Sequence, residues 1–235
     1  MEKKQSELCL EILRRFHKAG ILDDLILIGS WCIYFYKEYF SNISYIDQTT
    51  IRTRDIDFLI DKPAKLKHTV NIPELLKDLG FVTIFKGREG YLKLDHPDLM
   101  LEFLVPEKGK GTDKPVPLTK LGMNAIALRF LNLLTENIIK IKVEDFNISV
   151  PHPVNFALHK LIIFQRRLKE DKAAKDRNAA IKILRALITK GEVVTIKHVF
   201  NSMLPKWQKK VIKGLEEAKE RDILSIFNFE AACYT

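Results

Sequence analysis

The sequence predicts an α+β fold in which a mixed β-sheet is flanked by helices and is followed by a helical C-terminal domain. Short apolar and β-prone runs, separated by turn sequences, dominate the first half of the chain. After Pro151-His152-Pro153 the apolar residues recur at helical spacing instead. We therefore divide the chain into a sheet-containing domain over residues 1–152 and a basic helical domain over residues 153–235.

The expected elements can be placed in order along the chain. Residues 6–19 carry a helical stripe of apolar side chains that ends at Gly20, and residues 25–29 form an apolar run typical of a buried strand. Loops are expected over residues 41–54 and 106–117, which have the composition of connecting segments. The other expected strands cover residues 55–61, 81–85, 91–94, 99–105, 138–143 and 146–150. The other expected helices cover residues 31–40, 73–79, 154–169, 172–190, 195–203 and 206–220.

Length and composition exclude several classes of protein. The 235 residues are enough for one large domain or two small ones with a substantial core. No apolar run approaches the ~20 residues of a membrane-spanning helix, and the N-terminal residues have the pattern of an amphipathic helix instead of a signal peptide. The three cysteines, Cys9, Cys32 and Cys233, are far apart and odd in number, which indicates reduced thiols. We expect a cytoplasmic protein with no membrane partner.

Most of the excess positive charge lies in the last third of the chain. Residues 155–235 hold 17 lysines and arginines against 9 acidic residues, out of 39 and 30 in the whole chain. This asymmetry favours an anionic partner, such as tRNA or another RNA, for the helical domain. A solvated surface of lysine-rich helices explains the same pattern, and the sequence leaves both interpretations open.

Two carboxylates at the start of a predicted strand indicate a metal site. In Arg54-Asp55-Ile56-Asp57 the aspartates are two residues apart, so on a strand they project from the same face. Like charges this close need a cation between them, and carboxylate oxygens are the ligands that Mg²⁺ selects. Arg54 can contact a phosphate or neutralise the carboxylates, and both roles stay open.

A third carboxylate, Glu102, interrupts the apolar run of residues 99–105. A charged side chain in the middle of such a strand is costly to bury without a partner. We favour a role in binding metal together with Asp55 and Asp57. The alternative is that Glu102 lies on an exposed strand face or pairs with a nearby lysine.

An anion site is predicted beside the metal site. Gly29-Ser30 ends one predicted strand and precedes a predicted helix, and such a turn directs backbone N–H groups toward an anion. Neither the Gly-Ser turn nor the Asp-x-Asp motif is specific alone, but their order along the chain is considerably more so. Together they suggest chemistry on a nucleoside triphosphate.

The helical domain adds candidate phosphate contacts. Lys160 lies within an apolar helix, where its ammonium group either extends to solvent or meets an anion. A dense basic stretch follows it and suits phosphate contacts on a nucleotide or an RNA backbone, although such residues are also common on exposed helices. The stretch contains Arg166, Arg167, Lys169, Lys172, Lys175 and Arg177.

These motifs resemble the nucleotidyltransferase fold of the polymerase-beta superfamily, whose hallmark is Gly-Gly or Gly-Ser, then Asp-x-Asp, then a third carboxylate on a later strand. Three segments are similar to a bacterial branch related to the AbiEii-type toxin nucleotidyltransferases of toxin–antitoxin systems. They are Thr53-Arg54-Asp55-Ile56-Asp57-Phe58, Phe156-Ala157-Leu158-His159-Lys160-Leu161 and Lys172-Ala173-Ala174-Lys175-Asp176. The resemblance covers about residues 25–180.

The resemblance implies that residues 1–152 form a catalytic domain with a nucleotidyltransferase-like sheet. Gly29 and Ser30 would contact the triphosphate, and Asp55 and Asp57 would bind Mg²⁺ or Mn²⁺. Lys160 and Asp176 would form the wall that the helical domain contributes to the site.

The implied reaction moves a nucleoside monophosphate from a nucleoside triphosphate to an acceptor hydroxyl on an RNA end, a protein or a small molecule. Ser30 would help to hold the β- and γ-phosphates, and Glu102 would bind the metal ion that activates the acceptor. One alternative is a catalytically inactive nucleotide- or nucleic-acid-binding module on the same fold, such as an antitoxin-like or nucleotide-sensing partner protein. Another is a nuclease, which accounts less well for the Gly-Ser turn.

Overall fold

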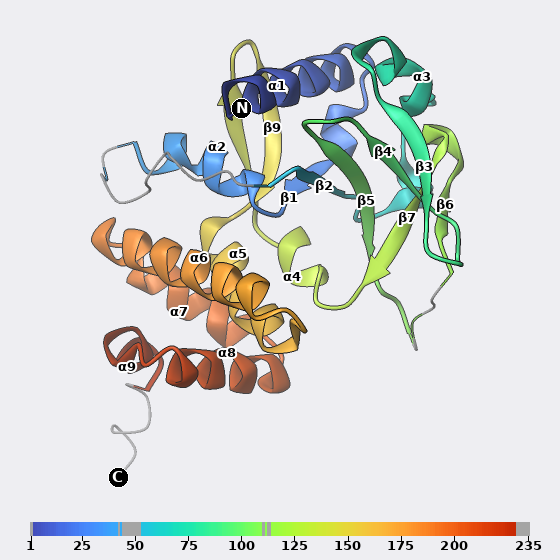
Figure 1. Cartoon of the computed structure of the whole chain (residues 1–235). Coiled ribbons are helices and arrows are strands. Elements are labelled where there is room, and N and C mark those ends of the chain that lie inside the picture. Colours follow the sequence, from blue (N-terminus) through green and yellow to red (C-terminus); the bar gives the residue numbers. More distant parts are fainter. Residues whose placement is uncertain (1, 42, 44–52, 110, 112–113, 229–235) are drawn as a thin grey trace. The chain divides into compact units, whose positions relative to one another are not determined.

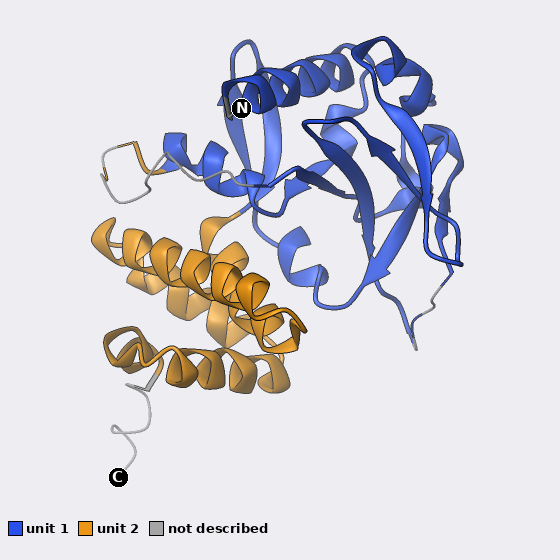
Figure 2. Cartoon of the chain, in the orientation of Figure 1, with its two compact units in different colours: residues 1–39, 48–151 blue, residues 40–47, 152–235 orange. Residues whose placement is uncertain are grey.

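The structure is a computed structural model that describes residues 2–41, 43, 53–109, 111 and 114–228 (Figure 1). It divides into two units (Figure 2). Unit 1 comprises residues 1–39 and 48–151, and unit 2 comprises residues 40–47 and 152–235. Among the helices within these described ranges, none is both long enough and apolar enough to cross a membrane.

A mixed sheet forms the centre of unit 1, with its strands in the order β3-β4-β5-β2-β1-β9-β8. Strands β2 and β5 pair in parallel, whereas β1–β2 and β4–β5 are antiparallel pairs. Strand β7 also pairs with β5, and β6 pairs with β7. The strand bounds are β1 Ile26–Ile28, β2 Asp55–Leu59, β3 Val82–Lys86, β4 Tyr91–Asp95, β5 Met100–Pro106, β6 Val116–Leu118, β7 Met123–Leu128, β8 Ile138–Val143 and β9 Phe146–Pro151.

An aromatic cluster joins the first helix to the middle of the sheet. Phe16 of the helix α1 meets the ring of Phe58 edge-on at 5.3 Å, and Phe58 stacks on Phe103 at 5.9 Å. All three side chains are almost fully buried, so α1 covers the face of β2 and β5 that carries them. The helices of unit 1 are α1 (Glu2–Lys18), α2 (Trp31–Tyr39), α3 (Ile72–Leu76) and α4 (Asn132–Thr135).

The opposite face of β2 and β5 is apolar at one end and acidic at the other. At the apolar end, Leu59 and Leu104 pack with Leu131 and Leu134, which belong to α4 or directly precede it. At the other end, Asp55, Asp57 and Glu102 are only partly buried. Because side chains two residues apart share a face of a strand, the same strands carry both the core and the carboxylates.

Unit 2 is built around one buried helix. Nearly every residue of α5 (Pro153–Ile163) is buried, because α6, α7 and α8 all pack against it. His152 caps its first turn, with Nδ1 accepting a hydrogen bond from the backbone N–H of Val154 at 3.2 Å. The other helices are α6 (Glu170–Thr189), α7 (Val193–Ser202), α8 (Pro205–Glu217) and α9 (Arg221–Asn228).

The predicted fold class is confirmed: a mixed sheet is flanked by helices, and the C-terminal part is helical. One expectation was partly wrong, because the segment expected as a loop over residues 106–117 contains the start of β6. Pro117 lies inside β6, and a proline within an apolar run usually argues against a strand. It is tolerated here because β6 pairs on one side only, with β7. Residues 42 and 44–52 of the expected loop 41–54 lie outside the described part of the chain.

Gly214 of α8 allows close contact between α8 and α5. A Cβ at this position would lie 3.0 Å from the Leu161 carbonyl oxygen, 3.0 Å from Phe164 Cε1 and 3.1 Å from Gln165 Nε2. The carbonyl oxygen belongs to the backbone of α5 and cannot move aside without disturbing that helix. Gln165 Nε2 also donates to the carbonyl oxygens of Leu161 and Lys210, each at 2.7 Å. The absence of a side chain at Gly214 therefore sets the spacing of these helices.

We expect Gly214→Val to lower the free energy of unfolding by roughly 1–3 kcal/mol, the usual cost of overpacking a core. Lys213→Val is the matched control, because it adds the same residue one position away on an exposed part of the same helix. Urea unfolding of both variants measures the difference. Equal losses of stability in the two variants would show that close α5–α8 packing is not the cause.

Candidate functional site

The end of β1 approaches a carboxylate of β2. Ile28 pairs with Asp57 in the antiparallel register, and Gly29 follows with φ +75°. A Cβ added at Gly29 would collide with Oδ2 of Asp57. Helix α2 begins directly after this turn, at Trp31. Glycine is thus required here for two reasons, the left-handed backbone conformation and the space that the carboxylate occupies.

The parallel register of β2 and β5 brings the third predicted carboxylate beside the second. Asp57 pairs with Glu102, and Asp55 pairs with Met100. Ile56, between the two aspartates, is fully buried on the opposite face. The structure therefore brings together Gly29, Asp57 and Glu102. Asp55 lies two residues before Asp57 on β2 and projects from the same face of the sheet.

A lysine that the sequence analysis did not single out lies among these carboxylates. Lys93 of β4 is only 2% exposed, and its Nζ forms an ion pair with Oε1 of Glu102. Burial, reinforced by the side-chain contact with Lys86 and by the positive charge of Lys86, lowers the pKa of Lys93 to about 8, although the charges of Asp55 and Asp57 act in the opposite direction. The sequence analysis left open whether Glu102, if it does not bind metal, lies on an exposed strand face or pairs with a nearby lysine. The structure shows the pairing with a lysine, Lys93.

Arg54, the other predicted contact of unit 1, is directed to the end of β4. Its Nη2 donates to Asp95 Oδ1 at 3.0 Å and to the His96 carbonyl oxygen at 2.5 Å. Both contacts lie near the exposed margin of the sheet. Arg54 thus links the start of β2 to the turn after β4, and its predicted phosphate contact stays a prediction.

The donor set suits a hard divalent cation in part. Carboxylate oxygens are the ligands that Mg²⁺ prefers, and Mg²⁺ is commonly held by one or two carboxylates together with substrate phosphates and water. Asp55 and Asp57 fit that arrangement, and the Gly29 turn leaves room beside Asp57. Within the part of the chain that the structure describes, no three His, Cys, Asp or Glu side chains are grouped to hold a metal ion. The prediction that Glu102 completes the metal set stays a prediction.

In unit 2, the two predicted residues Lys160 and Asp176 contact each other. Both are buried, and Lys160 Nζ lies 2.5 Å from Asp176 Oδ1. Arg167 Nε donates to the other oxygen, Oδ2, at 2.7 Å. Burial raises the pKa of Asp176, but the positive charges of Lys160 and Arg167 outweigh this effect and hold the pKa below its usual value. This network accounts for both buried charges, and its predicted role toward a nucleotide stays a prediction.

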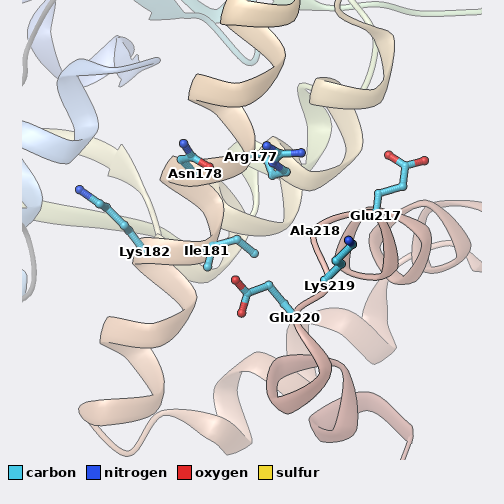
Figure 3. A pocket seen from close by; sticks show the side chains of 8 residues that line it. All are labelled: Arg177, Asn178, Ile181, Lys182, Glu217, Ala218, Lys219 and Glu220. Atoms are coloured by element: carbon cyan, nitrogen blue, oxygen red, sulfur yellow. The ribbon is translucent and has the colours of Figure 1, made fainter.

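A groove in unit 2 is a further candidate that the sequence analysis did not identify (Figure 3). It has a volume of about 510 Å³ and lies between α6 and the turn that follows α8. Its charged side chains are mixed in sign, and one of them, Glu220, accepts a hydrogen bond from Arg185 at 2.5 Å. The lining residues are Arg177, Asn178, Ile181, Lys182, Glu217, Ala218, Lys219 and Glu220. The two glutamates of this lining lie among three cationic side chains, and one of them is paired with Arg185, so the carboxylate site of unit 1 is the stronger candidate.

Comparisons with known proteins identify the family of the chain. A family model described as nucleotidyltransferase matches residues 7–203. The fold is similar to that of an antigenic nucleotidyltransferase-like protein from Paracoccidioides brasiliensis, with 12% identity, a TM-score of 0.53, and coverage of 94% of this chain and 93% of that one. At this identity the likeness concerns the fold alone.

Two further solved structures match, both of the antibiotic-resistance factor ANT(2'')-Ia. The complex with adenylyl-2''-tobramycin has 12% identity and a TM-score of 0.48, and covers 83% of this chain and 97% of that one. The solution structure has 12% identity and a TM-score of 0.44, and covers 86% and 100%. No curated protein matches the sequence at a significant level.

We expect Gly29→Ala to be more destabilising than Gly90→Ala. Both glycines have nearly the same positive φ, +75° and +76°, so both variants bear the roughly 1–2 kcal/mol cost of a left-handed alanine. Only at Gly29 does the new methyl group collide with a side chain, that of Asp57; at Gly90 nothing lies within 4 Å. Urea unfolding measures the difference. Equal losses would mean that the turn does not approach Asp57 as described.

Acid should destabilise the protein through His159. Burial, reinforced by the neighbouring Lys160 charge, lowers the pKa of this histidine to about 3. In the unfolded chain this imidazole binds a proton below about pH 6.5, whereas in the folded chain it stays neutral. The free energy of unfolding therefore falls as the pH drops below 6.5, by up to about 1.4 kcal/mol per pH unit. We expect His159→Phe to flatten the dependence of the unfolding free energy on pH between 6.5 and 5. His198→Phe, at an exposed site of α7, should leave it unchanged. An unaltered slope in His159→Phe would contradict the assignment.

Proposed function

The chain belongs to the nucleotidyltransferase family, and on this premise we propose that it moves a nucleoside monophosphate from a nucleoside triphosphate to an acceptor hydroxyl group with the help of Mg²⁺ or Mn²⁺. The observation that carries the proposal is the strand register in which Asp57 of β2 lies between the Gly29 end of β1 and Glu102 of β5. Carboxylates, a glycine turn and the start of a helix are the groups that phosphoryl transfer requires side by side.

The proposed roles follow from the chemistry of the side chains. Asp55 and Asp57 hold the divalent ion, which when bound offsets the charge of the phosphates. Gly29 and Ser30 receive the β- and γ-phosphates at the N-terminal end of α2 through backbone N–H groups and the serine hydroxyl. The acceptor oxygen bonds to the α-phosphorus as its proton passes to solvent, the bond between the α-phosphorus and the α–β bridging oxygen breaks, and pyrophosphate departs. Glu102 is the proposed metal ligand on the acceptor side.

The acceptor and the biological setting are further parts of the proposal. The basic C-terminal third favours an RNA acceptor, such as a tRNA end, over a protein or a small molecule. The segments similar to AbiEii-type enzymes favour a toxin-like role. A cytoplasmic location, where nucleoside triphosphates are abundant, completes the proposal. In unit 2, Lys160 and Asp176 are proposed to support nucleotide binding.

A second candidate function is a nucleotide-binding module without catalysis. One observation favours it: Glu102 is paired with Lys93, so the full set of three metal-binding carboxylates is not grouped in the described residues. The two candidates share nucleotide binding but differ in turnover. Release of pyrophosphate in the presence of acceptor RNA distinguishes them.

Calorimetric titration with each of the four nucleoside triphosphates and Mg²⁺ tests the proposal. We expect the wild-type protein to bind at least one of them only when Mg²⁺ is present. The double variant Asp55→Asn with Asp57→Asn should weaken that binding at least about tenfold, because the ion loses both carboxylates. Asp61→Asn is the control, since Asp61 follows the same strand and pairs only with the exposed Lys62 among the contacts described.

Binding that survives the double substitution would overturn the carboxylate site, and binding without Mg²⁺ would favour the nucleotide-binding module without catalysis. Failure of all four nucleotides to bind would overturn both candidates.

A further inference from the structure

Lys93 is a buried cation within a cluster of carboxylates. Its side chain is 3% exposed and that of Glu102 is 16% exposed. The antiparallel pairing of Leu94 with Leu101 sets the register of β4 and β5. The adjacent position of this register places Lys93 opposite Glu102. The position of the lysine is thus fixed by the sheet and not by a flexible loop.

A buried ammonium group is stable only when anions compensate for its lost hydration. Glu102 provides that compensation through the ion pair, and Asp55 and Asp57 are close enough to contribute electrostatically. The same carboxylates are the proposed ligands of a divalent ion. Lys93 and a metal ion therefore compete for the negative charge of Glu102.

This competition need not affect all three carboxylates equally. The direct partner of Lys93 is Glu102, whereas Asp55 and Asp57 interact with the lysine only through their charge. A divalent ion can be held by two carboxylates if phosphates and water complete its coordination. A second ion brings additional positive charge to a site that already holds a lysine, and the anionic triphosphate offsets that charge.

We propose that Lys93 is a positioning residue that holds Glu102 away from the metal ions until the nucleotide is bound. The inference rests on the proposed function and adds an order of events to it. The protein alone binds one divalent ion, through Asp55 and Asp57. When the triphosphate is bound, Glu102 would exchange its ion pair with Lys93 for a bond to a second ion.

Counting bound Mn²⁺ ions by electron paramagnetic resonance tests this order in the full-length protein. We expect one ion per chain in the free wild type and two in the presence of a non-hydrolysable nucleoside triphosphate. Lys93→Met should bind two ions without nucleotide, because Glu102 has lost its competing cation. Lys93→Arg should restore the wild-type count of one.

Lys86→Met is the matched control for charge. Lys86 is exposed on the neighbouring strand β3, and its side chain contacts that of Lys93. Its substitution removes a positive charge next to Lys93 but leaves the ion pair between Lys93 and Glu102. We expect it to leave the number of ions unchanged. If Lys86→Met gained as many bound Mn²⁺ ions as Lys93→Met, the effect would be explained by net charge alone, and the proposal would be overturned.

A second variant keeps the test decisive if Lys93→Met does not fold. Glu102→Gln should leave the single ion of the free protein in place and remove one of the two ions bound with the nucleotide. Two ions in the free wild type, no added ion in a folded Lys93→Met, or an unchanged count in Glu102→Gln with nucleotide would each overturn the inference. Failure of the proposed function is distinct from these outcomes, since it would appear as no Mn²⁺-dependent binding of the nucleotide by the wild type.

Discussion

Carboxylates held on one face of a sheet repel one another, and the strands around β2 are paired so that this repulsion is offset. The parallel register of β2 and β5 aligns Asp57 with Glu102, and β4 contributes Lys93 as the partner of Glu102. Two unit charges 4 Å apart interact by about 4 kcal/mol at an effective dielectric constant near 20. An internal lysine can therefore stabilise the acidic cluster during folding, before any ligand binds. The same lysine opposes the binding of a metal ion, because the ion must compete with it for the carboxylates.

The geometry of the acidic face depends on the packing of the apolar face. The register that stacks Phe58 on Phe103 is the register that pairs Asp57 with Glu102. A slip of one residue would turn the aromatic rings to the face that now carries the carboxylates, and it would turn the carboxylates into the apolar core. The cost of burying unpaired charges opposes this slip. Helix α1 secures this arrangement through Phe16. Residues far from the carboxylates in sequence thus hold them in place, and the fold and the site share one constraint.

Local sequence patterns predicted the parts of the site that local geometry controls. The Asp-x-Asp alternation and the Gly29-Ser30 turn depend on a strand and a turn, and both occur where they were predicted. Lys93 could not be identified in the same way, since it is one lysine in a short β-prone run and its partner is fixed by strand pairing. The alternative that Glu102 pairs with a nearby lysine was open, but the sequence does not say which lysine. Strand β7, helix α4 and helix α9 were missed because their short apolar runs carry no strong turn or capping signals.

The proposed function places a metal-bound nucleotide on the acidic face of β2 and β5. Paramagnetic broadening of backbone amide signals by Mn²⁺, added with a non-hydrolysable nucleoside triphosphate, tests it most directly. We expect the strongest broadening at Gly29, Asp57 and Glu102, and no broadening when Mg²⁺ replaces Mn²⁺. Broadening centred on the groove residues Ile181 and Ala218, with the signals of Gly29 and Asp57 intact, would contradict it.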